Sequence, residues 1–444
     1  MREQNTDIAS TSFRELLTSL SKEQKSNQEL LSSLSFVLRS FTNIQRYLEL
    51  VPVVVSKFLC VECVLVIPFA DNGKIRRDQL ATNNFIGQDD LIREVLLFKQ
   101  GMNNGFSFDK NKIKKLDNLI KKNINNSNMI ISSIKSRGRE RGRLYLFDFN
   151  KKTIFTETYN KYLQIITDIT SVALENDLLF KKIKEHERVD RQISIGGEIQ
   201  GQLLPDSCPT VEGIELAALC RPAFQVGGDY YDFIPTRPEL DGRRLERGKW
   251  AFLIGDVMGK GVPAGLLMTM LRGMLRAEVL TGLPPDRILH DLNQLAINDL
   301  SQSNRFLTLF YSDYDPRSKK LRYSNAAHNP PLLWRSKSKK VLRLDSSGLL
   351  IGLQKDSEYI SREIFLEPGD ALLYYTDGVT EAQGYTGERF DEKRLIDVFN
   401  CFAKKDLSAQ EILQKLFKKL DGFIGPENNL DDDASMVVLR VSKK

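Results

Sequence analysis

Gly255–Met268, which reads GDVMGKGVPAGLLM, is the stretch that decides the fold of the C-terminal half of this 444-residue chain. An alternating apolar run, Trp250–Gly255, leads into it and is typical of a β-strand. The apolar spacing of a helix follows from Pro263 onward. Asp256 stands between the two, so the stretch predicts a strand with a carboxylate at its end, then a glycine turn, then a helix.

Three other segments repeat this combination of an apolar strand, an aspartate and a turn. GGDYYDF contains Asp229, YYTDGVTEA contains Asp377, and NLDDDASMVVLR contains Asp432. One such aspartate by itself is most simply a turn residue at a strand end. Four of them in one domain, each held on a rigid strand end, indicate a shared site.

Aspartate suits the binding of hard divalent cations, because Mg²⁺ and Mn²⁺ prefer oxygen ligands. Four converging carboxylates repel one another, and bound cations relieve that repulsion. Two metal ions can also hold a bridging water, lower its pKa and orient it toward a phosphorus centre. The sequence has no G-x-S-x-G elbow and no P-loop lysine motif, and Cys208 and Cys401 lack the flanking residues of a phosphatase cysteine. We therefore expect metal-assisted hydrolysis without a protein nucleophile.

Further strand-like and helical patterns surround these motifs. Alternating apolar residues predict strands at 214–220, 250–255, 307–314, 320–324, 371–375 and 435–441. Helical spacing predicts helices at 263–280 and 285–300. The C-terminal half is therefore expected to contain packed β-sheets flanked by helices.

The N-terminal half reads as a separate α+β unit. Helical spacing runs from about Ser10 to Leu59, the β-rich run Val61–Phe69 follows, and Tyr159–Leu179 is helical again. Glu175–Gln202 is highly charged with a narrow apolar stripe, which predicts a connecting helix that could pair with its copy in a second chain. Gly196-Gly197 weakens this helix and could form a hinge.

Composition limits the classes of protein to which this chain can belong. Apolar residues make up 41%, charged residues 27%, and the net charge is +6, so we expect a globular chain with no dominant attraction to nucleic acid. Five scattered cysteines and an N-terminus without a secretory pattern lead us to expect a cytoplasmic protein. Leu50–Ala70 is apolar, but two prolines and two charged residues interrupt it, so a buried helix and strand are expected there and no membrane span.

The motifs that carry a family resemblance lie between residues 198 and 440. They are EIQGQLLP, RPAFQVGGDYYDF, GDVMGKGVPAGLLM, NAAHNPPLL, LLYYTDGVTEA and DDASMVVLR. In this order they resemble the bacterial branch of the metal-dependent serine/threonine protein phosphatases, the type found in sporulation and stress-response sigma-factor regulators. The resemblance implies an α-β-β-α sandwich with two Mn²⁺ or Mg²⁺ ions as cofactors.

The resemblance also implies which residues form the site. It places the metal-binding carboxylates at Asp229, Asp256, Asp377 and Asp432 and adds the backbone carbonyl of Val257. The aspartates on either side of Asp432 stay open as alternatives. Asp432 is preferred because the family pattern is two aspartates, a small or β-branched residue, and then Thr or Ser.

One position departs from the family pattern. Met258 stands where better-known eukaryotic members carry a histidine proposed as the general acid, so the leaving-group proton must come from water or another residue. His328 could supply it or could serve only as a loop residue. Lys260, and less strongly Arg221, could contact phosphate or could be surface or packing residues.

The N-terminal region resembles a GAF sensory domain, through its layout more than through motif residues. The expected organisation is a helical segment at 1–33, the sensor at 34–175, a helical linker at 176–204 and the phosphatase domain at 205–444. Together they imply a sensor-regulated phosphatase acting on phosphoserine or phosphothreonine of a protein, of the type of an anti-sigma-factor antagonist in partner switching. A small ligand or partner protein at the sensor and a homodimer through the linker are also implied. The alternative is a catalytically weak module that binds a phosphoprotein.

Overall fold

The computed structural model describes most of the chain, which divides into two compact units, residues 1–187 and 188–444. The described residues are 28, 29, 32, 44–70, 80–83, 110–123, 128–149, 155–236, 248–426 and 430–443. The helical segment predicted at 1–33 and most of the helical spacing at residues 10–43 therefore lie outside them.

The N-terminal unit is built on an antiparallel sheet with strand order β2-β1-β4-β3. Its strands are β1 (Cys63–Pro68), β2 (Ala81–Thr82), β3 (Asn128–Ser136) and β4 (Arg139–Asp148). Helix α2 (Ile44–Leu59) and the first part of α5 (Glu157–Gly201) pack on one face, and α4 (Lys110–Asn123) packs on the other. Alternate residues of β1 enter these two cores, as the pleat of a strand requires.

Part of this unit was predicted from the sequence, whereas helix α4 lies in an Asn- and Lys-rich stretch in which no helix was predicted. The helix expected at Ile44–Leu59 is present, and the strand expected within Val61–Phe69 is β1. The apolar run Leu50–Ala70 is therefore a buried helix followed by a buried strand. Within the ranges described, no helix is long and apolar enough to cross a membrane. The likeness of this unit to a GAF domain stays a prediction.

Helix α5 is continuous through Gly196-Gly197, so the hinge expected there does not interrupt it. Gly197 has a different role: a Cβ at this position would overlap the carbonyl oxygen of Gln225. The glycine lets the helix approach the loop that precedes β6. Several apolar residues along α5 are exposed, among them Leu179, Phe180, Ile183 and Val189 in its middle part.

The C-terminal unit contains two five-stranded antiparallel sheets. The first has the order β11 (Lys340–Arg343), β10 (Leu332–Arg335), β13 (Ala371–Tyr375), β14 (Ala434–Val441) and β5 (Ile214–Arg221). The second has the order β12 (Arg362–Phe365), β9 (Lys320–Ala326), β8 (Leu307–Asp315), β7 (Trp250–Val257) and β6 (Asp229–Pro235). The helices are α6 (Val262–Leu280), α7 (Pro285–Gln302), α8 (Asp377–Thr380), α9 (Asp391–Ala403) and α10 (Ala409–Ile424).

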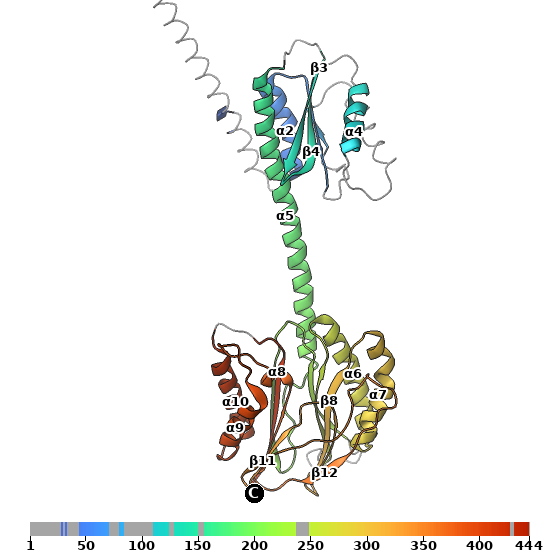
Figure 1. Ribbon diagram of the computed structural model, residues 1–444, viewed down its shortest axis with the longest axis vertical. Coiled ribbons are helices and arrows are strands. Elements are labelled where there is room, and N and C mark those ends of the chain that lie inside the picture. Colours follow the sequence, from blue (N-terminus) through green and yellow to red (C-terminus); the bar gives the residue numbers. More distant parts are fainter. Residues whose placement is uncertain are drawn as a thin grey trace, which may run out of the picture. The chain divides into compact units, whose positions relative to one another are not determined.

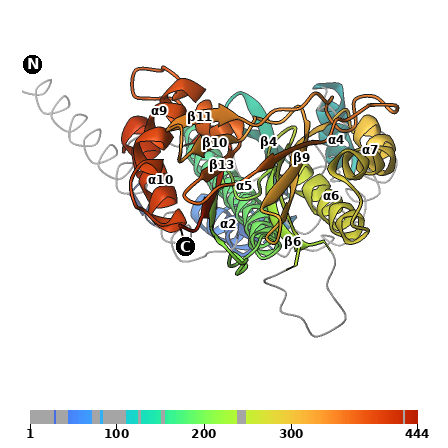
Figure 2. The ribbon, with the colours of Figure 1, turned by 90° about the horizontal axis from the view of Figure 1, so that it is seen from below.

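The two sheets pack face to face through an aromatic core that includes Phe252, Phe310 and Tyr374. Helices α6 and α7 cover the outer face of the second sheet, and α9 and α10 cover the outer face of the first (Figures 1 and 2). These four layers are the sandwich predicted for this half of the chain. The strands and helices predicted from residue 214 onward are all present, with ends shifted by at most two residues.

Candidate metal centre

Asp229 and Asp256 face each other across two neighbouring strands. Asp229 begins β6, Asp256 lies near the end of β7, and the antiparallel register places them directly opposite one another. Residues opposite one another in such a pair project from the same face of the sheet. Burial raises the pKa of Asp229 well above its usual range, and the charge of Asp256 raises it further.

The first sheet supplies Asp377, the first residue of α8, which follows β13 after the single residue Thr376. Burial raises its pKa, and the next largest cause is the charge of Asp432. Thr376 joins the two sheets here, because its hydroxyl donates to Asp229 Oδ2 at 2.8 Å and accepts from the Ser435 amide at 3.0 Å. Sequence patterns had not singled out Thr376.

Asp256, in the second sheet, is affected by the charges of aspartates from the first sheet. Its pKa is raised to about 8, most of all by burial and then by the charges of Asp377 and Asp432. A carboxylate in this position is costly to ionise unless a cation is present. The charges of the four aspartates thus affect one another's pKa values.

The acidic run at residues 431–433 contains aspartates with different roles. Asp433 is 5% exposed, and its two oxygens accept from the amides of Ala223 at 2.8 Å and Gly228 at 2.7 Å. Asp432 has a side chain that is 40% exposed, with Oδ2 lying 3.1 Å from Lys260 Nζ. Asp433 therefore fastens the loop before β6, whereas Asp432 is half-exposed, and its Oδ1 accepts from the Asp433 amide at 2.9 Å. The choice of Asp432 as the ligand stays a prediction.

The backbone around Gly228 forms a small oxygen-lined space. A Cβ on Gly228 would lie 2.7 Å from the carbonyl oxygen of Val257 and 3.0 Å from Asp256 Oδ1. The absent side chain thus leaves room beside two of the predicted donors. Carboxylate and carbonyl oxygens are the donor set that Mg²⁺ and Mn²⁺ prefer, so these residues fit the ions chemically.

The arrangement is more open than a closed coordination shell. Within the ranges that the structure describes, no three Asp, Glu, His or Cys side chains lie close enough together to enclose a metal ion as they stand. The site residues Asp229, Asp256, Val257, Asp377 and Asp432 therefore remain predicted ligands.

The turn after β7 is held by Arg305, which donates from Nη1 to the Met258 carbonyl at 2.6 Å. Gly259 has φ 105°, and a Cβ there would overlap the Arg305 guanidinium. Only glycine fits this close approach without strain. Met258 itself has no proton to donate, as the sequence indicated.

His328 is a buried loop residue. Its Nδ1 pairs with the Thr308 hydroxyl at 2.8 Å, and its amide donates to Asn325 Oδ1 at 2.8 Å. Burial lowers its pKa to about 4, so the ring is neutral at physiological pH. Of the two roles considered for His328, the structural one fits these contacts.

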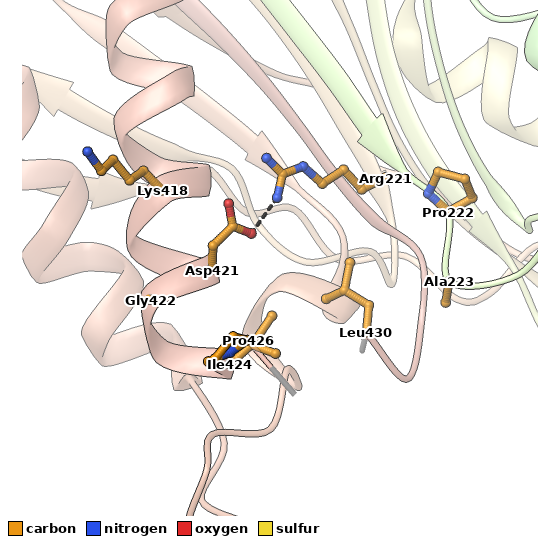
Figure 3. A pocket seen from close by; sticks show the side chains of 10 residues that line it. Arg221, Pro222, Ala223, Lys418, Asp421, Gly422, Ile424, Pro426 and Leu430 are labelled. Carbon is orange, nitrogen blue, oxygen red and sulfur yellow. Dashed lines mark hydrogen bonds and ion pairs between the residues drawn. The ribbon is translucent and has the colours of Figure 1, made fainter. Parts of the chain in front are cut away.

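Arg221 is held by helix α10. It pairs with Asp421, and its guanidinium lies 4.3 Å from the centre of the Phe417 ring. Together with Lys418 and Leu430 it lines a cavity of about 930 Å³ (Figure 3). Packing and pairing account for Arg221, so nothing in its contacts favours the phosphate role considered for it.

Asp232 is a charged residue that the sequence patterns did not identify. It is fully buried in β6 and accepts from Arg276 Nε at 2.7 Å, Arg276 Nη2 at 3.0 Å and the Tyr230 hydroxyl at 2.6 Å. This bidentate pair fastens α6 to the strand that begins with Asp229. A charged residue within an apolar strand was the only signal available in the sequence.

Known proteins match mainly the C-terminal unit. The pattern of the family Stage II sporulation protein E (SpoIIE) matches residues 246–442. Phosphoserine phosphatase RsbU of Bacillus subtilis is 30% identical over 259 residues, which are 57% of this chain and 71% of RsbU. Phosphoserine phosphatase RsbP of the same organism is 25% identical over 196 residues, which are 43% of this chain and 45% of RsbP. The solved SiaA-PP2C domain of Pseudomonas aeruginosa is 23% identical, with a TM-score of 0.49, covering 58% of this chain and 99% of that domain.

Proposed function

Because the chain belongs to the family of phosphoserine phosphatase RsbU, we propose that its C-terminal unit is a metal-dependent phosphatase for phosphoserine or phosphothreonine on a protein. The observation that carries the proposal is the meeting of strand-end aspartates from both sheets. The charges of Asp377 and Asp432, from one sheet, raise the pKa of Asp256 in the other. A divalent cation is the partner that such a cluster lacks.

In the proposed mechanism Asp229, Asp256, Asp377 and Asp432 hold two Mn²⁺ or Mg²⁺ ions, together with the carbonyl of Val257. When bound, the ions would activate a water for attack on phosphorus. The rest of the chain keeps the donors in place. Thr376 orients Asp229, and Asp433 fixes the loop that contains Gly228 (residues 222–228).

In this proposal, solvent water protonates the leaving serine or threonine oxygen. Met258 cannot donate a proton, and the His328 ring is neutral and enclosed in the protein core. The Met258 turn is itself half-open to solvent, because that side chain is 44% exposed. Water can therefore reach the leaving group without a protein acid.

We further propose that the substrate is a phosphorylated anti-sigma-factor antagonist in a cytoplasmic partner-switching pathway. The names of RsbU and RsbP support a phosphoserine substrate. The N-terminal unit would sense a small ligand or a partner protein and regulate the phosphatase. Homodimerisation would occur through the exposed apolar residues of α5.

The test is Mn²⁺-dependent hydrolysis of p-nitrophenyl phosphate and of a synthetic phosphoserine peptide by the full-length protein. We expect activity that is lost on chelation and falls at least a hundredfold in Asp377→Asn. Asp406→Asn is the matched control, because Asp406 is an exposed aspartate that pairs with Lys443. A wild-type protein that binds the peptide but releases no phosphate would instead support the phosphoprotein-binding module.

A further inference from the structure

Lys260 places a positive charge at the rim of the candidate metal centre. Its ammonium lies 3.1 Å from Asp432 Oδ2, also donates to the carbonyl oxygen of Asp431, and lies 5.8 Å from the centre of the Phe224 ring. Its side chain is 46% exposed. The ammonium is thus in contact with a predicted metal ligand and within reach of solvent.

The position of Lys260 is fixed by its backbone. It lies between Gly259 and Gly261, whose φ angles of 105° and 72° only glycine adopts readily. Arg305 anchors the preceding carbonyl at Met258. The four-carbon side chain is flexible by contrast, so the charge can move while its base stays in place.

Lys260 acts electrostatically on Asp256 and Asp377 as well as on Asp432. Its charge opposes the rise in pKa of both Asp256 and Asp377, the two carboxylates on either side of the sheet junction. A divalent cation bound by Asp432 would carry charge of the same sign within a few ångströms of the ammonium. The two cations therefore compete for the Asp432 carboxylate.

Building on the proposed phosphatase, we infer that Lys260 is an exchangeable counter-ion. It neutralises Asp432 in the metal-free protein, leaves that carboxylate when a divalent cation binds there, and then contacts the phosphate group of the substrate. An ammonium is a common partner of phosphate, and the exposed mouth of the site gives the freed side chain access to it.

This role predicts two effects of opposite sign in Lys260→Gln. Removing the competing charge should tighten Mn²⁺ binding by roughly three- to tenfold. Removing the phosphate contact should raise the KM for a synthetic phosphoserine peptide by about tenfold. A residue that only supported the turn would weaken both. Lys260→Arg retains the charge, so it should keep the wild-type Mn²⁺ affinity and recover most of the lost peptide affinity.

The experiment is calorimetric titration of metal-free full-length protein with Mn²⁺, followed by kinetics with the phosphoserine peptide at saturating Mn²⁺. Lys320→Gln is the matched control, because Lys320 forms an ion pair with Glu363 of the same 3.1 Å length away from the aspartates. It should change neither value. The effect of Lys260→Gln on Mn²⁺ affinity should also disappear in an Asp432→Asn background.

Weaker or unchanged Mn²⁺ binding by a folded Lys260→Gln protein would overturn the inference, as would an unchanged KM. If Lys260→Gln does not fold, Lys260→Met and Lys260→Arg decide the same question, since only the first removes the charge. A wild-type protein that binds Mn²⁺ but hydrolyses nothing would refute the proposed phosphatase and the phosphate contact. Even then the Mn²⁺ titrations would decide whether Lys260 competes for Asp432.

Discussion

Substitution by asparagine should have different effects at the neighbouring residues Asp433 and Asp432. At Asp433 it should lower thermal stability, and at Asp432 it should lower Mn²⁺ affinity. The Asp433 carboxylate is buried and accepts two backbone amides, from Ala223 and Gly228. Each such hydrogen bond to a charged acceptor contributes about 1.5–3 kcal/mol. Asp433→Asn keeps one acceptor and turns an amide donor toward the other N–H, so it should cost roughly 3 kcal/mol.

Part of this cost is offset in the metal-free protein, because the substitution also removes a charge that raises the pKa of Asp229 and Asp256. We expect a net loss of about 2 kcal/mol, or roughly 4–8 °C in Tm for a unit of this size. Asp432→Asn breaks a solvent-exposed ion pair with Lys260, which is worth about 0–1 kcal/mol, and the Asn side-chain oxygen can still accept from the Asp433 amide. Its Tm should therefore change by less than about 4 °C, whereas its Mn²⁺ affinity should fall at least tenfold.

Thermal unfolding followed by circular dichroism in EDTA gives the first quantity, and calorimetric Mn²⁺ titration gives the second. The reasoning is refuted if Asp432→Asn lowers Tm as much as Asp433→Asn does. It is equally refuted if Asp433→Asn leaves Tm unchanged and abolishes Mn²⁺ binding, because the ligand would then be Asp433.

Four further outcomes follow from particular side chains. The pKa of Asp256 is raised to about 8 in the folded protein, so the contribution of its neutral carboxyl to metal-free stability is complete below the unfolded-state pKa of about 4 and is lost as the pH rises to about 8. This loss should lower Tm in EDTA as the pH approaches 8, and saturating Mn²⁺ should reduce the fall. Arg276→Met leaves the buried Asp232 carboxylate without its cation and should lower the free energy of unfolding in urea by about 2 kcal/mol, a value reduced because Arg276 is 44% exposed. His328→Gln should leave the shape of the pH–activity profile between about pH 5.5 and pH 8 unchanged, because the pKa of His328 is lowered to about 4. Loss of one limb of that profile in the variant would instead identify His328 as the general acid. Ile183→Glu should convert the proposed dimer to a monomer in size-exclusion chromatography with light scattering, and a wild-type monomer would contradict the proposal.

Periodicity predicted six strands and two helices of the C-terminal unit, because each strand buries alternate residues and each amphipathic helix buries one stripe. It did not predict β10, β11, β12, α9 or α10. The strand predicted at Ala371–Tyr375 has the same bounds in the structure, and α6 begins one residue before the predicted Pro263. The four aspartate motifs were visible for a similar reason. A strand end followed by a turn is a local pattern, and its residues are adjacent in the chain.

The sequence by itself determined which aspartates were candidates, but it did not separate Asp432 from Asp433. The amides that donate hydrogen bonds to the Asp433 carboxylate belong to Ala223 and Gly228, more than 200 residues away in the chain. Tertiary contacts likewise decided that Asp232 is an anchor for α6 and that His328 is a neutral core residue. Burial and distant hydrogen-bond donors set these roles, and both exist only once the two sheets have packed together.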